Sequence, residues 1–89
     1  MSEATLPECP KLAPLFRMQY EQAQSAWVLL YPEGMVQLNA SAAEILRRCD
    51  GAHTADSIVS EIETQFNAQG IAPEIMNLLH EANRRGWIV

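Results

Sequence analysis

The apolar residues follow two different periods along the chain, and the change falls within residues 38–41. Between residues 16 and 38 they alternate with polar residues or form a short unbroken run, which is the pattern of β-strands. After residue 41 they recur every three or four positions, as in helices with one buried face. The pattern therefore predicts an α+β fold, in which a three-stranded antiparallel sheet is followed by a three-helix cluster in a winged-helix-like arrangement.

Three strands are predicted. The stretch FRMQYE (residues 16–21) alternates strictly and is typical of a half-buried strand. The stretch AWVLLY (residues 26–31) is apolar on both faces, as a central strand covered on both sides would be. A proline-glycine turn separates it from MVQL (residues 35–38), a third and short strand. The short connections favour an antiparallel meander with residues 35–38 at one edge.

Three helices are predicted to follow. The first begins with a capping box of Ser41 and Glu44, in which each side chain bonds the backbone N–H of the other residue, and it stops at Gly51. Thr54 caps the second helix, and Pro73 suits the first turn of the third. The expected buried faces are Ala42, Ile45, Leu46 and Cys49 in the first, Ile58, Val59, Ile62 and Phe66 in the second, and Ile75, Leu78, Leu79 and Ala82 in the third.

Length and composition indicate one small domain, with 89 residues, of which 48% are hydrophobic and 19% charged. Residues 1–14 contain three prolines and show no period, so we expect a flexible N-terminal arm there and the folded domain over residues 15–89. No apolar run is long enough to span a membrane, and the N-terminus lacks the features of a secretory signal. We therefore expect a cytoplasmic protein with no membrane partner.

The charge argues against nucleic acid as a partner. Eleven acidic and six basic residues give a net charge of −5, which repels a phosphate backbone. Winged-helix proteins that read DNA need basic side chains on the recognition helix, but in the third predicted helix only Arg84 and Arg85, at its far end, are basic. We therefore expect no salt-sensitive DNA affinity, although a DNA-binding regulator is a third class to test.

No catalytic or metal-binding cluster is evident. The candidate ligands are Cys9, Cys49, His53 and His80, and they form neither a C-x-x-C nor an H-x-x-x-H motif. Cys49 lies on an apolar helical face and is expected to be a small buried hydrophobe, while both histidines are expected to be solvated. We therefore expect no enzymatic activity, no metal and no cofactor, and binding is the favoured class of function.

The short strand over residues 35–38 is the candidate binding element, because unpaired backbone groups at a sheet edge can accept an extended peptide. The N-terminal arm or a second copy of the chain could cover this edge instead. On the third helix, Met76 and Asn83 border the apolar face. A flexible methionine there suits the wall of a groove, or it simply packs against a neighbouring element.

Three stretches of the chain resemble the PqqD family, whose members are small proteins of pyrroloquinoline quinone biosynthesis. They are PKLAPLFRMQYEQAQ (residues 10–24), LLYPEGMVQLNASAAEILRRCDG (residues 29–51) and RRGWIV (residues 84–89). The most specific motif, LNxSAAEILRxCDG, spans residues 38–51. The resemblance leaves only residues 1–9 outside it.

The resemblance implies a peptide chaperone that binds the precursor peptide PqqA and presents it to the radical SAM enzyme PqqE. It also implies that the peptide is held as an added strand beside the third strand and over the third helix. The peptide-binding residues would then be Met35, Val36, Gln37, Leu38, Ile75, Met76, Leu79 and Asn83. The alternative is a structural or oligomerising domain, such as a homodimer, whose edge strand pairs with its own copy. The surface that meets the enzyme stays open between the acidic face of the second helix and the arginines at positions 47, 48, 84 and 85.

Overall fold

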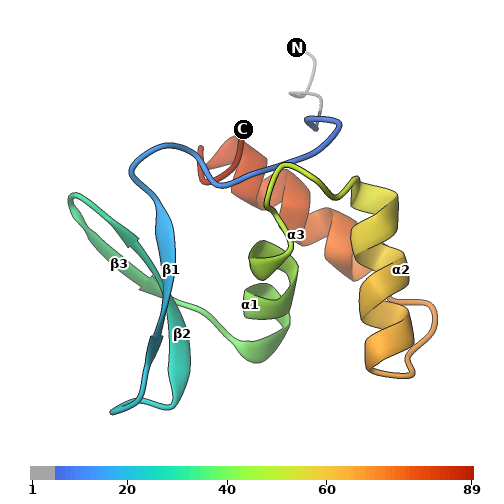
Figure 1. Cartoon of the computed structure of the whole chain (residues 1–89), viewed down its shortest axis with the longest axis horizontal. Coiled ribbons are helices and arrows are strands. Elements are labelled where there is room, and N and C mark those ends of the chain that lie inside the picture. Colours follow the sequence, from blue (N-terminus) through green and yellow to red (C-terminus); the bar gives the residue numbers. More distant parts are fainter. Residues whose placement is uncertain (1–5) are drawn as a thin grey trace.

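The computed structural model describes residues 6–89, which form three strands followed by three helices (Figure 1). This order confirms the predicted α+β fold. None of the helices among these residues is long and apolar enough to cross a membrane. The strands are β1 (Arg17–Glu21), β2 (Ala26–Tyr31) and β3 (Gly34–Gln37), and the helices are α1 (Ala40–Arg47), α2 (Ala55–Gln65) and α3 (Ala72–Arg84).

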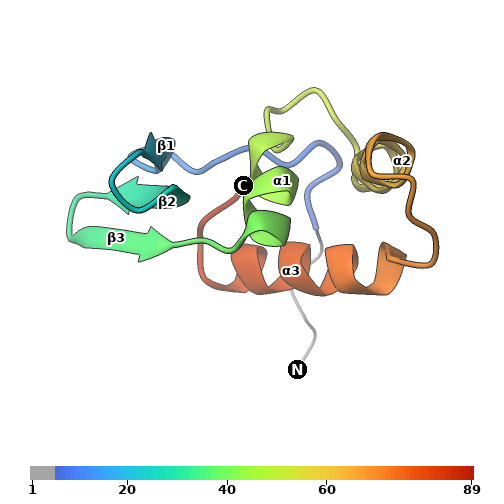
Figure 2. The same cartoon turned by 90° about the horizontal axis from the view of Figure 1, so that it is seen from below.

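The three strands form one antiparallel sheet in the order β1-β2-β3, as predicted, so both β1 and β3 are edge strands. The central residues Val28 and Leu29 of β2 are fully buried. Leu29 belongs to the main core, whereas Val28 lies on the opposite face between Gln19 and Gln37 of the neighbouring strands. Both faces of β2 are therefore covered at its centre, as predicted, and helix α1 packs against this strand (Figure 2).

Helix α1 is the centre of the molecule, since it packs against β2, α2 and α3 (Figure 1). The small side chains of Ala42 and Ala43 are buried and allow these elements to approach closely. The helix begins earlier than predicted, because Asn39 is the N-cap and its side-chain oxygen accepts a hydrogen bond from the Ala42 N–H at 2.7 Å. The predicted capping box of Ser41 and Glu44 is therefore wrong: asparagine caps as well as serine does, and it stands two positions earlier.

The cap can be tested with two alanine substitutions. Asn39→Ala should lower the free energy of unfolding by about 1 kcal/mol, because one N–H of the first turn loses its partner. Ser41→Ala, the matched control, should change stability little, since Ser41 is exposed in the first turn and alanine is a good helix former. Urea denaturation of both variants gives the comparison, and a larger effect at position 41 would contradict the assignment.

The other two helices follow the sequence patterns closely. Thr54 caps α2 as predicted, with its hydroxyl oxygen accepting from the Ser57 N–H at 3.1 Å, and Pro73 lies in the first turn of α3. Phe66, at the C-terminal end of α2, was expected to be buried but is 50% exposed. In α3 the buried residues are Ile75, Leu79 and Ala82, and the predicted core residue Leu78 is only partly buried.

Residues near the two ends of the chain pair with each other. Lys11 and Val89 exchange two backbone hydrogen bonds, of 3.1 and 2.8 Å, and the Ala13 N–H donates to the Trp87 carbonyl at 2.8 Å. Figure 1 shows this N-terminal stretch, in blue, running past the C-terminus. The predicted arm over residues 1–14 is thus wrong for residues 10–13, which belong to the folded domain. Residues 1–5 lie outside the described part of the chain.

Candidate functional site

The direction of the backbone N–H and C=O groups in β3 determines which of its residues can form hydrogen bonds with an added strand. The Leu38 N–H donates to the Trp27 carbonyl at 2.9 Å, which extends the β2–β3 ladder by one residue. Antiparallel ladders alternate between hydrogen-bonded and non-bonded pairs. Val36 therefore bonds to Leu29 across the ladder, whereas the N–H and C=O groups of Met35 and Gln37 point away from β2. The open edge of β3 consists of the backbone groups of these two residues.

The predicted peptide-binding residues divide into two groups by burial. Met35 and Gln37 are exposed, and Val36, Met76 and Asn83 are partly buried. The remaining three belong to one buried cluster, which joins the end of β3 to α3; they are Leu38, Ile75 and Leu79. These three buried side chains pack in the core and hold the end of β3 and α3 in position. Figure 2 shows β3 and α3 along the same side of the molecule, with the strand running toward the helices.

An apolar hollow begins at Asn39, two residues beyond the end of β3. It has a volume of about 610 Å³ and lies between the start of α1, the end of α2 and the first half of α3. Phe66, Ile71 and Leu78 line it, together with the first turn of α1 after Asn39. The side of α3 that faces the β3–α1 junction therefore carries Leu78 rather than Met76 or Asn83, which project from the opposite border of the apolar face.

Sequence reasoning missed these three lining residues for a physical reason. Phe66 and Leu78 each fit the buried face of their helix, and periodicity assigns such residues to the core. In the folded protein, however, Phe66 is 50% exposed and Leu78 is only partly buried, and both line the hollow. No signal in the sequence distinguishes an apolar residue at such a gap from one within a closed core.

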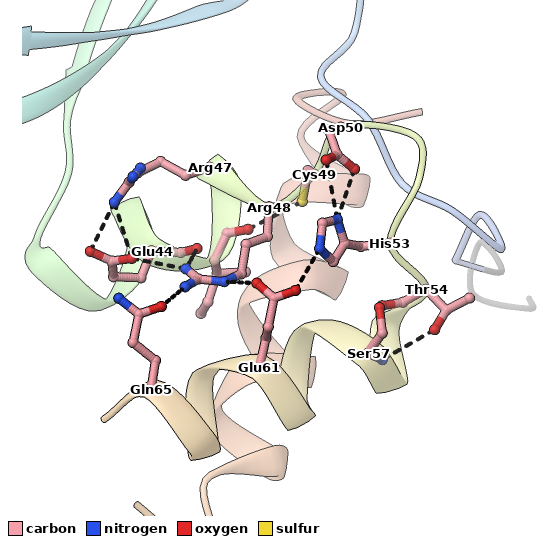
Figure 3. A network of polar contacts seen from close by, with 11 residues as sticks. Glu44, Arg47, Arg48, Cys49, Asp50, His53, Thr54, Ser57, Glu61 and Gln65 are labelled. Carbon is pink, nitrogen blue, oxygen red and sulfur yellow. Dashed lines mark hydrogen bonds and ion pairs between the residues drawn. The ribbon is translucent and has the colours of Figure 1, made fainter. Parts of the chain in front are cut away.

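A polar network joins the end of α1 to α2 (Figure 3). The guanidinium of Arg48, whose side chain is only 11% exposed, donates to the carboxylates of Glu44 and Glu61, both at 2.8 Å, and also to Gln65. His53 lies between Asp50 and Glu61, at 3.0 Å from the first and 2.8 Å from the second. The expectation that His53 is merely solvated is therefore wrong. Arg48, committed to this network, is a poor candidate for contact with a partner.

The network has a pH dependence that can be measured. Hydrogen bonds to the carboxylates of Asp50 and Glu61 raise the pKa of His53 above its ordinary value. Protonated His53 therefore stabilises the folded protein. This contribution is fully present below the ordinary histidine pKa, and it is lost as the pH rises through the pKa that His53 has in the folded protein. We expect His53→Gln to destabilise the protein more at about pH 5.5 than at about pH 8.5. Urea denaturation at both pH values tests this, and an equal effect at both would contradict it.

The described residues hold no group of three or more side chains suited to a metal ion. Cys49 is buried, which raises the pKa of its thiol to about 12, with a further contribution from the nearby Asp50. Such a thiol is almost entirely protonated near neutral pH and is a poor nucleophile. The structure thus confirms that Cys49 is a small buried hydrophobe. The features of the protein that suit binding are the open edge of β3 and the apolar hollow.

Comparison with solved structures defines the class of fold. The chain is similar to the solution NMR structure of the PqqD truncation of Methylobacterium extorquens PqqCD, which is described as a stand-alone recognition element for ribosomally synthesized and post-translationally modified peptides. The TM-score is 0.76 at 23% sequence identity, covering 90% of this chain and 87% of the other. The two proteins share their fold.

Sequence comparison then gives the family. The family described as coenzyme PQQ synthesis protein D (PqqD) matches residues 26–88. A protein of Methylococcus capsulatus named PqqA binding protein is 50% identical over 78 residues, which cover 88% of this chain and 84% of the relative. A protein of the same name from Azotobacter vinelandii is 46% identical over 89 residues, covering 99% and 97%. The chain belongs to the PqqD family, which confirms the resemblance seen in its sequence.

Proposed function

We propose that this protein is a peptide chaperone of pyrroloquinoline quinone biosynthesis, which binds a PqqA-type precursor peptide as an additional strand along β3. The observation that carries the proposal is the open edge of β3, where the backbone groups of Met35 and Gln37 point away from the sheet. An extended peptide can bond to these groups whatever its side chains are. Membership of the PqqD family and the names of the two relatives support PqqA as the peptide.

The apolar hollow gives the proposal a place for side-chain recognition. A strand added along β3 runs toward the first turn of α1 and reaches the hollow there. Apolar side chains of the peptide would replace water against Phe66, Ile71 and Leu78. The peptide-binding set proposed here therefore keeps Met35, Val36 and Gln37, adds these three residues, and gives Leu38, Ile75 and Leu79 a supporting role. Met76 and Asn83, on the other border of α3, would contribute less.

The later step, presentation of the bound peptide to a PqqE-like radical SAM enzyme, follows from the same proposal. In this role the chain acts in the cytoplasm and catalyses no reaction itself. Arg84 and Arg85 at the end of α3 remain candidates for contact with the enzyme, since their side chains are 75% and 58% exposed and share one carboxylate, Glu81. The acidic face of α2 is the second candidate surface.

An amide NMR titration with PqqA-type precursor peptide tests the proposal. We expect chemical-shift changes at Met35 and Gln37, whose N–H groups face the added strand, and at Phe66 and Leu78 around the hollow. Smaller changes are expected at Met76 and Asn83. The absence of shifts along β3 at saturating peptide would refute the strand-addition model, and larger shifts at Met76 than at Leu78 would place the groove on the other border of α3.

A second candidate function is self-association through the same edge, in which β3 pairs with its own copy and the protein is a structural domain. The same open backbone groups of Met35 and Gln37 favour it. Added peptide would then dissociate the oligomer, because both would use one edge. Sedimentation velocity with and without peptide separates the two functions.

A further inference from the structure

The sheet has a second open edge, on the side away from β3. Strand β1 is paired only with β2 in the described part of the chain, and three of its five residues are exposed. Two of the large apolar side chains that are exposed lie at or next to this edge: Tyr20 is 47% exposed and Leu15 is 77% exposed. We propose that β1 pairs antiparallel with β1 of a second copy, centred on Gln19, so that two sheets join into one.

The ladder fixes which groups of β1 face outward. Leu29 directs its backbone groups to Val36 of β3, so its neighbours in β2, Val28 and Leu30, direct theirs to β1. These two residues are paired with Gln19 and Arg17. It follows that the backbone groups of Met18 and Tyr20 point away from β2.

Pairing about Gln19 uses all of these outward groups. With a two-fold axis at Gln19, Met18 of one copy stands opposite Tyr20 of the other, and each such pair exchanges two backbone hydrogen bonds. Both pairs therefore satisfy every outward N–H and C=O group of the two residues. A register shifted by two residues in either direction leaves some of them unpaired.

The side chains of β1 are complementary to themselves in this register. Arg17 of one copy lies opposite Glu21 of the other, and the symmetry produces this pair twice. Both are non-bonded positions, where strands bring side chains closest together. Opposite charges that face each other in this way stabilise a strand pair, whereas like charges destabilise it. Gln19 faces its own copy on the axis, where two amides can bond each other.

This interface leaves β3 available. A dimer formed through β1 presents two separate β3 edges, one at each end of the joined sheet, so it can hold two peptides at once. Dimerisation and peptide binding are then independent, in contrast to self-association through β3. A failure of the protein to dimerise through β1 would therefore leave the proposed peptide binding along β3 unaffected, and the reverse also holds.

Charge reversal on the full 89-residue chain tests the register. Sedimentation velocity from micromolar to millimolar protein should show a reversible dimer. Arg17→Glu should raise the dimer dissociation constant at least tenfold, because the introduced carboxylate would face Glu21 of the other copy twice. Glu21→Arg should do the same by placing arginine opposite arginine. The double substitution Arg17→Glu with Glu21→Arg restores both pairs and should return the dissociation constant close to its original value.

The design contains its own control for net charge. Arg17→Glu makes each chain more negative and Glu21→Arg makes it less negative, so an effect of overall charge would move the two dissociation constants in opposite directions. Circular dichroism and urea denaturation verify that each variant is folded. A monomer at millimolar concentration, single reversals without effect, or a double variant that is not rescued would overturn the proposal. Dissociation of the dimer by saturating PqqA-type peptide would also overturn it, because β3 would then be the shared edge.

Discussion

Gln37→Pro is expected to weaken the binding of a PqqA-type peptide at least tenfold while the protein stays folded. The N–H of Gln37 points away from β2 toward the position of the added strand. Proline removes this donor, and its ring occupies the space in which the first hydrogen bond to the peptide would form. Proline is tolerated on an edge strand when the missing N–H faces solvent, so the sheet itself should persist. Isothermal titration calorimetry and circular dichroism measure the two effects.

Two further substitutions serve as controls for Gln37→Pro. Gln37→Thr keeps the N–H group and suits a strand, so it should bind the peptide almost as well as the unchanged protein. Val36→Pro removes a donor that bonds to Leu29 within the sheet, and it should therefore unfold the β2–β3 hairpin. Full affinity in folded Gln37→Pro protein would mean that the peptide does not use the β3 edge.

Ile88→Ala is expected to give the largest loss of stability, about 2–5 kcal/mol in the free energy of unfolding. Ile88 is 2% exposed and belongs to the main core, although it is the second-last residue of the chain. Truncation to alanine removes buried apolar surface and leaves a cavity that the surrounding core can close only in part. Because small domains have only about 5–15 kcal/mol of total stability, this loss is a large share of it.

The matched control is its neighbour, Val89→Ala. Val89 is 47% exposed, and its backbone bonds to Lys11 do not depend on the side chain. The free energy of unfolding of this variant should lie within about 0.5 kcal/mol of that of the unchanged protein. Urea denaturation of both variants provides the test. Similar stability for Ile88→Ala and Val89→Ala would show that the C-terminal residues contribute little to the fold.

Local patterns were sufficient to predict the elements, their order, the cap of α2 and the proline in the first turn of α3. The periods of two and of three to four positions distinguish strand from helix because side-chain direction repeats with the backbone geometry. Short connections then give the antiparallel meander, since few other topologies can be built with them. The cap of α1 was misassigned because Asn39 and Ser41 are both good caps, and only the position of the preceding strand selects between them.

The candidate site was predictable only in part. The sequence predicted that residues 35–38 form an edge strand, and the family motif indicated the kind of protein. Neither showed that Met35 and Gln37 present the open backbone groups. That depends on the hydrogen bond between Leu38 and Trp27, which fixes the phase of the whole ladder. The sequence also could not show which border of the apolar face of α3 lies toward β3. A helical pattern identifies the buried face but not the elements that lie next to its two borders.

The sequence by itself determined the fold class, the three strands, the three helices and the family of this protein. These features follow from residues that are near one another along the chain. The tertiary structure decided the features that join distant residues, namely the pairing of residues 11–13 with residues 87–89, the network around Arg48 and the hollow lined by Phe66 and Leu78. Contacts of this kind form only when the whole chain has packed around α1, and no local pattern records them.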